Sequence, residues 1–344
     1  MNFTKFDPTD EAVQTSEQRN ELELGRYLPF GVKFLDDAMI GISKGDLVLI
    51  GGRSGGGKTE LATHIAMTNA LQGKRVYFFA LEAERNEIAD RIKYKALANC
   101  YFSEPHSKRT HIAYDRWKAG LLAREFAPYV SVVNEGLKAL DKLFVRYGEE
   151  NYTIDQYDKD MLEIKDKADL IIIDHLHYFD LDESQANAEL KAIMKRIKFL
   201  ALQYQTPVVL VAHIRKQDKR FANLVPDQED FHGSSDVIKI ATKAITIASA
   251  YGRKNYQAGP SHDGKATLEE IKLPVNQFAS YMRIVKNRRN GSVCTPTALV
   301  SYSPETNSYG SGYILGDEMS DKGSAAFIAR EPSEIPSWAE GAGK

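Results

Sequence analysis

The residues best suited to chemistry lie between positions 52 and 59, where the sequence matches the pattern G-x-x-x-x-G-K-[ST]. Glycines let such a loop turn its backbone N–H groups inward around a phosphate, and the following helix N-terminus adds partial positive charge. We expect Lys58 to contact the β and γ oxygens of a nucleotide and the Thr59 hydroxyl to ligate Mg²⁺. An apolar run precedes the loop and a helical pattern follows it, which argues against a chance match by a glycine-rich turn. The predicted nucleotide-binding residues are Gly52, Arg53, Ser54, Gly55, Gly56, Gly57, Lys58 and Thr59.

Three polar residues stand at or just after the ends of other apolar runs. Asp174 follows LIII and is placed to support Mg²⁺, since ligands of such folds gather at the carboxyl ends of the strands. Glu82 follows the run 76–81, and if that strand lies beside the phosphate-loop strand, its carboxylate can orient and deprotonate a water. Glu84 competes for this role, and a helix-capping role is the alternative. His213 follows the run 208–212, and we expect it to contact the γ-phosphate rather than serve only as a structural histidine.

Two basic clusters are candidates for contacts with nucleic acid or with a second subunit. The first cluster, at 214–220, opens a polar segment that runs to position 235. This segment is predicted to be a flexible loop that could contact the backbone of single-stranded nucleic acid, and ordinary solvated charge is the alternative. The second spans 282–291, where Lys286 and Arg288 lie two residues apart at the end of a strand and so face the same way. Arg288 reaching a neighbouring subunit's γ-phosphate would be an arginine finger. The basic residues of the first cluster are Arg215, Lys216, Lys219 and Arg220.

Short apolar runs and helical stretches alternate along the chain, and these elements could position the residues named above. The runs are continuous rather than alternating, as expected of strands that are buried on both faces. The predicted helices span 59–72 and 187–203, and the segment 301–306 is expected to be an edge segment or hairpin because of Pro304. We therefore predict an α/β fold with a mostly parallel twisted sheet flanked by helices. The predicted strands are 47–50, 76–81, 170–173, 208–212, 244–247 and 282–285.

The charge of the chain is unevenly spread. Lys plus Arg is 45 and Asp plus Glu is 47 in 344 residues, so the net charge of −2 excludes a protein that coats nucleic acid through bulk positive charge. Residues 1–24 sum to −4 and residues 317–344 to −3, which leaves +5 for the part between them. We predict an acidic N-terminal linker segment (1–25), with a short helix around 10–24, one motor domain (26–316) and an acidic flexible C-terminal tail (317–344).

Cysteine content and hydropathy predict the compartment. The two cysteines are too few for a disulfide framework, and no apolar run approaches the roughly 18 residues needed to cross a bilayer. The sequence therefore predicts a soluble cytoplasmic protein, or one of a host cytoplasm if viral, with no membrane partner.

The order and spacing of these motifs resemble those of the RecA-like hexameric replicative helicases, the DnaB, phage primase-helicase and Twinkle type. His213 begins an H-x-R-K run, Phe231 begins an F-x-G-S element that includes Gly233 and Ser234, and Lys286 begins K-N-R-x-x-G. The resemblance covers roughly residues 26–303. It implies a RecA-like P-loop NTPase fold and an ATP- and Mg²⁺-dependent DNA helicase that moves 5′→3′ as a homo-hexamer around single-stranded DNA.

Carried over onto this sequence, the resemblance assigns catalytic roles to Lys58, Glu82, Asp174, His213, Lys286 and Arg288. It implies DNA contacts from Arg215, Lys216, Lys219, Arg220, Gly233 and Ser234. Two positions depart from the pattern. DnaB-type members usually carry Gln where His213 stands, and Arg289 takes the place of an aromatic residue that stacks on the base, a role a guanidinium can also fill. A separate primase or helicase loader is expected as a partner. The alternative is a RecA- or KaiC-like DNA-binding ATPase that acts as a switch without unwinding.

Overall fold

The structure is a computed structural model of the 344-residue chain. It describes residues 27–104, 112–148, 152–180, 186–214, 225–231, 235–249, 257–258, 269–270, 280–288, 297–300, 302–303, 308–309, 313–321 and 324–330.

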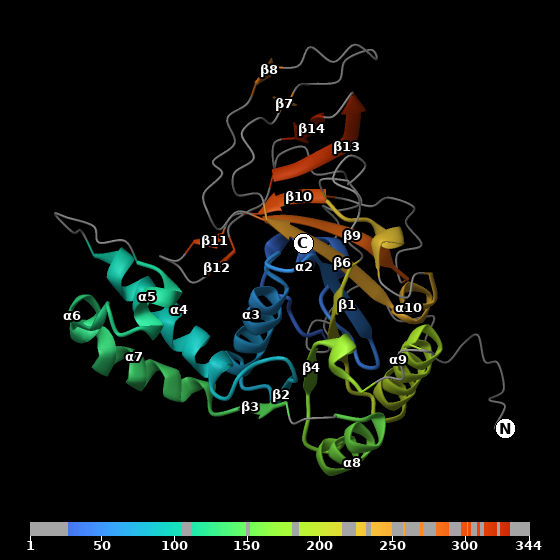
Figure 1. The fold of residues 1–344 in the computed structure, drawn as a ribbon, viewed down its shortest axis with the longest axis horizontal. Helices are drawn as coiled ribbons and strands as arrows, with labels where there is room; N and C mark the ends of the chain where they lie inside the picture. The colour runs from blue at the N-terminus through green and yellow to red at the C-terminus, as the bar shows by residue number, and fades with distance from the viewer. Residues whose placement is uncertain are drawn as a thin grey trace, which may run out of the picture.

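A ten-stranded sheet forms the centre of the molecule, in the order β14-β13-β10-β9-β6-β1-β5-β4-β2-β3 (Figure 1). Neighbouring strands from β3 to β6 pair in parallel, and those from β6 to β14 pair antiparallel. The parallel half confirms the predicted fold class, and it holds the phosphate loop and the strands that lead to Glu82, Asp174 and His213. The strands are β1 (Leu47–Gly52), β2 (Val76–Ala80), β3 (Leu143–Tyr147), β4 (Leu170–Asp174), β5 (Val208–His213), β6 (Lys243–Ser249), β9 (Ser280–Asn287), β10 (Thr297–Val300), β13 (Tyr313–Asp321) and β14 (Ser324–Arg330).

Helices cover both faces of the parallel strands. Because side chains alternate along each strand, they pack into two hydrophobic cores, one on each face of the sheet. Val48 and Ile50 pack on the face covered by α2 (Lys33–Met39), α3 (Lys58–Leu71) and the start of α4 (Glu87–Ser103). Leu47 and Leu49 point to the other face, covered by α8 (Ile154–Ile164), α9 (Ala186–Gln203) and α10 (Ser235–Ile240). Burial on both faces explains why the strands read as continuous apolar runs.

A helical arm between β2 and β3 stands off one side of the sheet (Figure 1). Its elements are the rest of α4, α5 (Tyr114–Lys118), α6 (Ala123–Phe126), η1 (Ala127–Tyr129), α7 (Val130–Leu137) and η2 (Lys138–Leu140). They enclose a small core of their own that includes Leu97, Tyr101, Leu122, Phe126 and Val133. None of the described helices combines the length and the apolar character needed to cross a bilayer.

The six predicted strands and both predicted helices are confirmed, with ends that shift by a few residues. Tyr302–Ser303 (β11) pairs with Ser308–Tyr309 (β12), so the segment after 301 begins a hairpin, one of the two forms expected. The remaining short elements are η3 (Leu176–Tyr178), η4 (Gln228–Asp230), β7 (Gln257–Ala258) and β8 (Glu269–Glu270).

The C-terminal boundary predicted at 316/317 falls inside a strand. Residue 317 lies inside β13, which pairs with β10 on one side and β14 on the other, so the sheet continues to residue 330. Small and polar residues suggested a tail, but an antiparallel hairpin at a sheet edge is held by backbone hydrogen bonds and does not require an apolar run. The predicted N-terminal linker and its helix lie outside the described part of the chain.

Candidate active site

The phosphate loop joins the carboxyl end of β1 to α3, as its sequence context predicted. Gly55 and Gly57 have φ values of 72° and 93°, a left-handed conformation that favours glycine. A Cβ added at Gly52 would lie 2.7 Å from the carbonyl oxygen of Ile247, and one at Gly56 would lie 2.9 Å from that of Arg53. The backbone therefore needs glycine at these four positions, which leaves its N–H groups accessible to a phosphate.

Lys58 is the first residue of α3 and is almost fully buried. Its Nζ donates a hydrogen bond to the carbonyl oxygen of Arg53 at 3.0 Å, within the loop itself. Burial lowers the pKa of Lys58, while the carboxylates of Asp174 and Glu82 act in the opposite direction. An ammonium held inside the loop next to two carboxylates is placed to bind the oxygens of a phosphate.

Asp174 ends β4 and lies against the start of α3, where it accepts a hydrogen bond from the Thr59 side chain. Burial raises the pKa of Asp174 to about 6, and the bond from Thr59 opposes that shift. Its Oδ1 is buried and, among the described residues, has no hydrogen-bond partner. An unpartnered carboxylate oxygen beside a threonine hydroxyl fits a Mg²⁺ ion, which prefers oxygen ligands.

Glu82 reaches the same edge of the sheet by a different route from the one expected. The sequence reasoning supposed that its strand might lie beside the phosphate-loop strand, but β5 and β4 separate β2 from β1. The backbone N–H of Leu81 donates to the carbonyl oxygen of Asp174 at 2.7 Å, which holds the residues after β2 next to the end of β4. The Glu82 side chain is 54% exposed.

His213 ends β5 at the level of Gly52, its register partner on β1. Burial lowers the pKa of His213, and the nearby charge of Lys58 lowers it further. The neutral imidazole therefore stands next to the phosphate loop, at the position predicted for a contact with the γ-phosphate.

His175 is a residue of the site that the sequence reasoning missed. Its Nε2 lies 2.9 Å from Glu82 Oε2 and 2.8 Å from His213 Nε2, so the three side chains form a continuous chain of contacts. It is 5% exposed, and burial lowers its pKa to about 3. The available signal was a histidine directly after the strand-end acid Asp174.

A cleft of about 520 Å³ lies between the phosphate loop and the strand ends. Besides the loop residues 54–59, Glu82, Asp174 and His213 line it, as predicted. Glu84 lines it as well, but Glu82 is the one that contacts His175. Glu60, Glu87 and Arg91 line it too and were not singled out in the sequence.

Lys286 and Arg288 lie at the opposite end of the strands, level with the start of β6. Strand β9 runs antiparallel to β6, so Lys286 pairs with Ala244 near the start of β6, and the N–H of Arg288 donates to the carbonyl oxygen of Thr242. The Lys286 Nζ donates to the carbonyl oxygens of Ile238 and Lys239, in the last turn of α10, at 2.6 and 2.9 Å. Burial and the neighbouring Arg288 lower its pKa. Arg288 is exposed.

The predicted nucleic-acid loop can be placed only by its ends. Ile214 and Phe231 form an antiparallel bridge, so the segment between them leaves and returns at the carboxyl end of β5, beside the cleft. The predicted DNA-binding residues Arg215, Lys216, Lys219, Arg220, Gly233 and Ser234 lie outside the described residues, as does the predicted nucleotide-binding residue Arg289.

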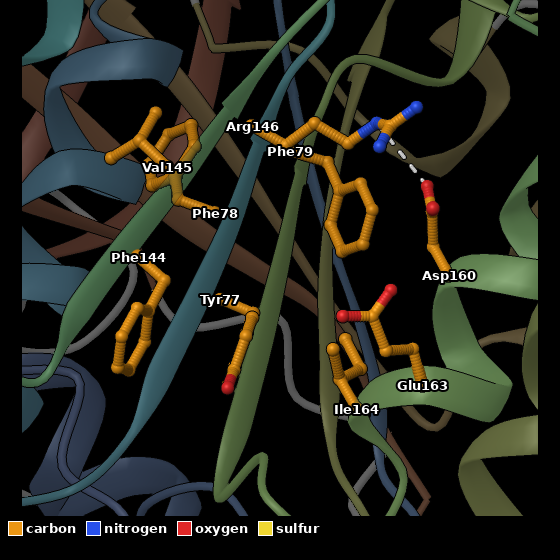
Figure 2. A pocket seen from close by; sticks show the side chains of 9 residues that line it. All are labelled: Tyr77, Phe78, Phe79, Phe144, Val145, Arg146, Asp160, Glu163 and Ile164. Carbon is orange, nitrogen blue, oxygen red and sulfur yellow. Dashed lines mark ion pairs between the residues drawn. The ribbon is translucent and has the colours of Figure 1, made fainter.

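A second pocket lies at the outer end of the sheet, between β2, β3 and α8 (Figure 2). Tyr77 and Phe144 stack there with ring centroids 4.7 Å apart, and Arg146 forms an ion pair with Asp160 at 3.2 Å. These side chains line a partly uncovered strand face, and none of the predicted catalytic residues is among them. Of the predicted catalytic residues, Lys58, Glu82, Asp174 and His213 line the phosphate-loop cleft instead.

Comparisons with known proteins agree with this arrangement. Residues 28–310 match the family model described as DnaB-like helicase C terminal domain. A probable plasmid replicative DNA helicase of Chlamydia trachomatis serovar L2 is 27% identical over 224 residues, which cover 64% of this chain and 46% of the relative. The chain thus spans about half the length of curated relatives that it matches.

Solved structures show the same fold at low identity. A DnaB-like replicative helicase, described together with its interactions with primase, superposes with a TM-score of 0.65 at 16% identity, covering 89% of this chain and 67% of that one. A KaiC-like protein of Pyrococcus horikoshii gives a TM-score of 0.50 at 14% identity, covering 84% of this chain and 99% of that one.

Proposed function

Because the chain belongs to the DnaB-like helicase C-terminal domain family, we propose that it is the motor of a replicative-type DNA helicase that hydrolyses ATP to move along single-stranded DNA. The observation that supports this most directly is the convergence of Lys58, Asp174, Glu82 and His213 on one cleft. A phosphate clamp, a metal-binding carboxylate, a base and a polar contact for the γ-phosphate are the parts that phosphoryl transfer to water requires.

Each residue has a role that follows from its position. The loop N–H groups and Lys58 bind the β- and γ-phosphates, and Thr59 and Asp174 hold Mg²⁺, which neutralises charge on the phosphate oxygens. Glu82 orients the attacking water and accepts its proton. His213, beside the end of the phosphate loop, contacts the γ-phosphate and responds to its loss.

Arg288 acts on the nucleotide of a neighbouring subunit in this proposal. In one chain it lies at the level of Thr242, whereas the phosphate loop begins at the level of Ile247, five residues further along β6. Five residues of strand span roughly 16 Å, and an arginine side chain reaches roughly 7 Å, so its own nucleotide is out of range. This separation supports a ring, proposed as a homo-hexamer, in which Arg288 and Lys286 face the next subunit's cleft.

The remaining parts of the proposal rest on the family resemblance. Single-stranded DNA passes through the ring with 5′→3′ polarity, contacted by the loop that begins after Ile214. Residues 1–25 link neighbouring subunits, and a separate primase or loader engages the ring. ATP and Mg²⁺ are the cofactors, and the cytoplasm, or that of a host, is the proposed location.

Unwinding of forked DNA by wild type and by Glu82→Gln tests the function. We expect ATP-dependent strand separation by wild type and a loss of both unwinding and ATPase of about 10²-fold or more in Glu82→Gln. Glu84→Gln is the matched comparison, and its loss should be much smaller because Glu84 lines the same cleft without the contact to His175. ATPase stimulated by single strands with no unwinding, in the presence of a loader, would favour the RecA- or KaiC-like switch instead.

A further inference from the structure

The base proposed for hydrolysis is a poorly restrained side chain unless something holds it. Glu82 is on a loop just after β2, and its side chain is 54% exposed. An exposed glutamate samples several rotamers, whereas a general base must lie within hydrogen-bond distance of the attacking water. The described contact that restrains it is His175 Nε2, at 2.9 Å from its carboxylate.

His175 is itself rigidly placed. Only 5% of it is exposed, and its backbone follows directly from the buried strand β4. Its ring packs edge-on against that of His213, with centroids 4.2 Å apart and planes at 79°. A buried side chain on the end of a central strand is a firm support for a mobile neighbour.

A proton, rather than a metal ion, fits between these three side chains. Glu82, His175 and His213 are ligand types that can hold Zn²⁺, and their ligand atoms gather within 4.8 Å. Two ligand atoms around a tetrahedral Zn²⁺ would be roughly 3.3 Å apart, given bonds of roughly 2.0 Å. The observed separations, 2.9 Å to Glu82 and 2.8 Å to His213, are shorter than that and within hydrogen-bond distance, and the contact with His213 is a hydrogen bond.

The hydrogen bonds available to His175 also indicate where its proton lies. In its neutral form an imidazole carries a single N–H, on one of its two ring nitrogens. Its Nδ1 is buried with no hydrogen-bond partner in the described part of the chain, whereas Nε2 has two neighbours. The proton therefore belongs on Nε2, where it can be donated either to the Glu82 carboxylate or to His213.

Binding of a γ-phosphate at His213 selects between these two acceptors. When His213 donates its Nε2–H to the phosphate, that nitrogen can no longer accept a bond from His175. The N–H of His175 is then left to the Glu82 carboxylate, and a bond to a charged acceptor is the stronger of the two.

From this geometry we propose that His175 is a positioning residue that aims the Glu82 carboxylate at the attacking water and links its orientation to the contact of His213 with the γ-phosphate. The proposal rests on the proposed function, because it takes Glu82 as the base of ATP hydrolysis. It adds a residue whose own atoms need not touch the substrate.

Steady-state ATPase of the full chain with single-stranded DNA and Mg²⁺ tests the proposal. In His175→Leu we expect kcat to fall about 10- to 100-fold with KM for ATP within about threefold of wild type, since binding groups are unaffected. His175→Gln should recover most of kcat, because its amide N–H can donate from a position close to that of Nε2. His177→Leu is the matched control, since its ring lies 5.8 Å from that of His175, outside the three-residue chain.

Measuring His175→Leu both alone and combined with Glu82→Gln distinguishes a failure of this proposal from a failure of the proposed function. If His175 acts through Glu82, adding His175→Leu to Glu82→Gln causes no further loss. Near-normal ATPase in Glu82→Gln alone would refute the assignment of the base. A large loss in Glu82→Gln together with near-normal kcat in His175→Leu would refute only the positioning role.

Two further results would also overturn the positioning role. One is that His175→Gln is as inactive as His175→Leu while both bind a fluorescent ATP analogue and unfold at the wild-type temperature. The other is stoichiometric Zn²⁺ binding by the wild-type chain in calorimetry that is lost in His175→Gln, which would place a metal where we place a proton.

Discussion

The placement of Arg288 leads to a prediction about which subunit completes each active site. Arg288→Ala removes the only atoms of this residue that could reach a phosphate, and the loss of such a finger costs on the order of 10³-fold in turnover. Arg288→Lys should recover little of it, because an ammonium lacks the planar fork of the guanidinium. The separation of roughly 16 Å along β6, derived above from the pairing with Thr242 and Ile247, means that this loss is felt at a neighbour's nucleotide.

Mixing two inactive variants measures this directly. A site in a mixed ring is complete when the chain that binds ATP is Arg288→Ala, with Lys58 intact, and its neighbour is Lys58→Ala, with Arg288 intact. For equal amounts and random assembly, this holds for about one half times one half, or a quarter, of all interfaces. We therefore expect the mixture to reach roughly a quarter of wild-type ATPase, on the order of 10²-fold above either variant alone.

A finger acting within its own chain predicts the opposite outcome, because every chain in the mixture would then lack one essential group. Native mass spectrometry, with one variant isotopically labelled, shows whether mixed rings have formed. A silent mixture that contains mixed rings would refute the reasoning from strand register. Turnover of Arg288→Ala within about twofold of wild type would refute the role of the residue altogether.

Three further predictions concern stability. An added methyl in Gly51→Ala would overlap the fully buried Phe231 ring, so it should cost about 2 kcal/mol in thermal or urea unfolding and be partly rescued by Phe231→Leu. Lys243 is fully buried and lies 3.1 Å from Asp46, so Lys243→Met should lower the free energy of unfolding by about 3–5 kcal/mol. Asp46→Asn in the same chain should reduce that loss, and additive effects of the two substitutions would contradict the pairing. Burial raises the pKa of Asp36 to about 6 from its ordinary 3.8, so the folded state binds this proton more tightly than the unfolded state. The protonated Asp36 therefore contributes on the order of 2 kcal/mol to the free energy of unfolding, and this contribution is lost as pH rises from about 4 to about 6. Urea unfolding across that range should show a shallower fall in Asp36→Asn than in wild type, and equal slopes would be evidence against it.

Elements with strong local signals were predictable from the sequence. The runs that became β1, β2, β4 and β5 are buried along nearly their whole length, which makes them continuous and apolar. By contrast β3 was missed, because four of its five residues are half-buried, Phe144 is exposed, and Arg146 interrupts the apolar run. A short apolar run that is interrupted by a charged residue does not stand out from a loop.

The sequence alone predicted which residues meet at the cleft. Spacing within the phosphate loop predicted the positions of Lys58 and Thr59. Asp174 and His213 stand at the ends of strands and so reach the same side of the sheet, because parallel strands all end there. The reasoning needed no knowledge of strand order for these residues. Glu82 also lies at this cleft although β2 is not beside β1, because the chain after β2 returns to Asp174.

Only the tertiary structure decided which residues join that chemistry from a distance. The bridge made by His175 depends on β4 and β5 being neighbours, and the distance of Arg288 from the phosphate loop of its own chain depends on β9 running antiparallel to β6. Strand order and register minimise the free energy of the whole sheet through contacts between residues far apart in the chain, so no local window of sequence contains them. The sequence therefore identified residues that line the cleft, while the fold decided how they are oriented and that Arg288 lies far from the phosphate loop of its own chain.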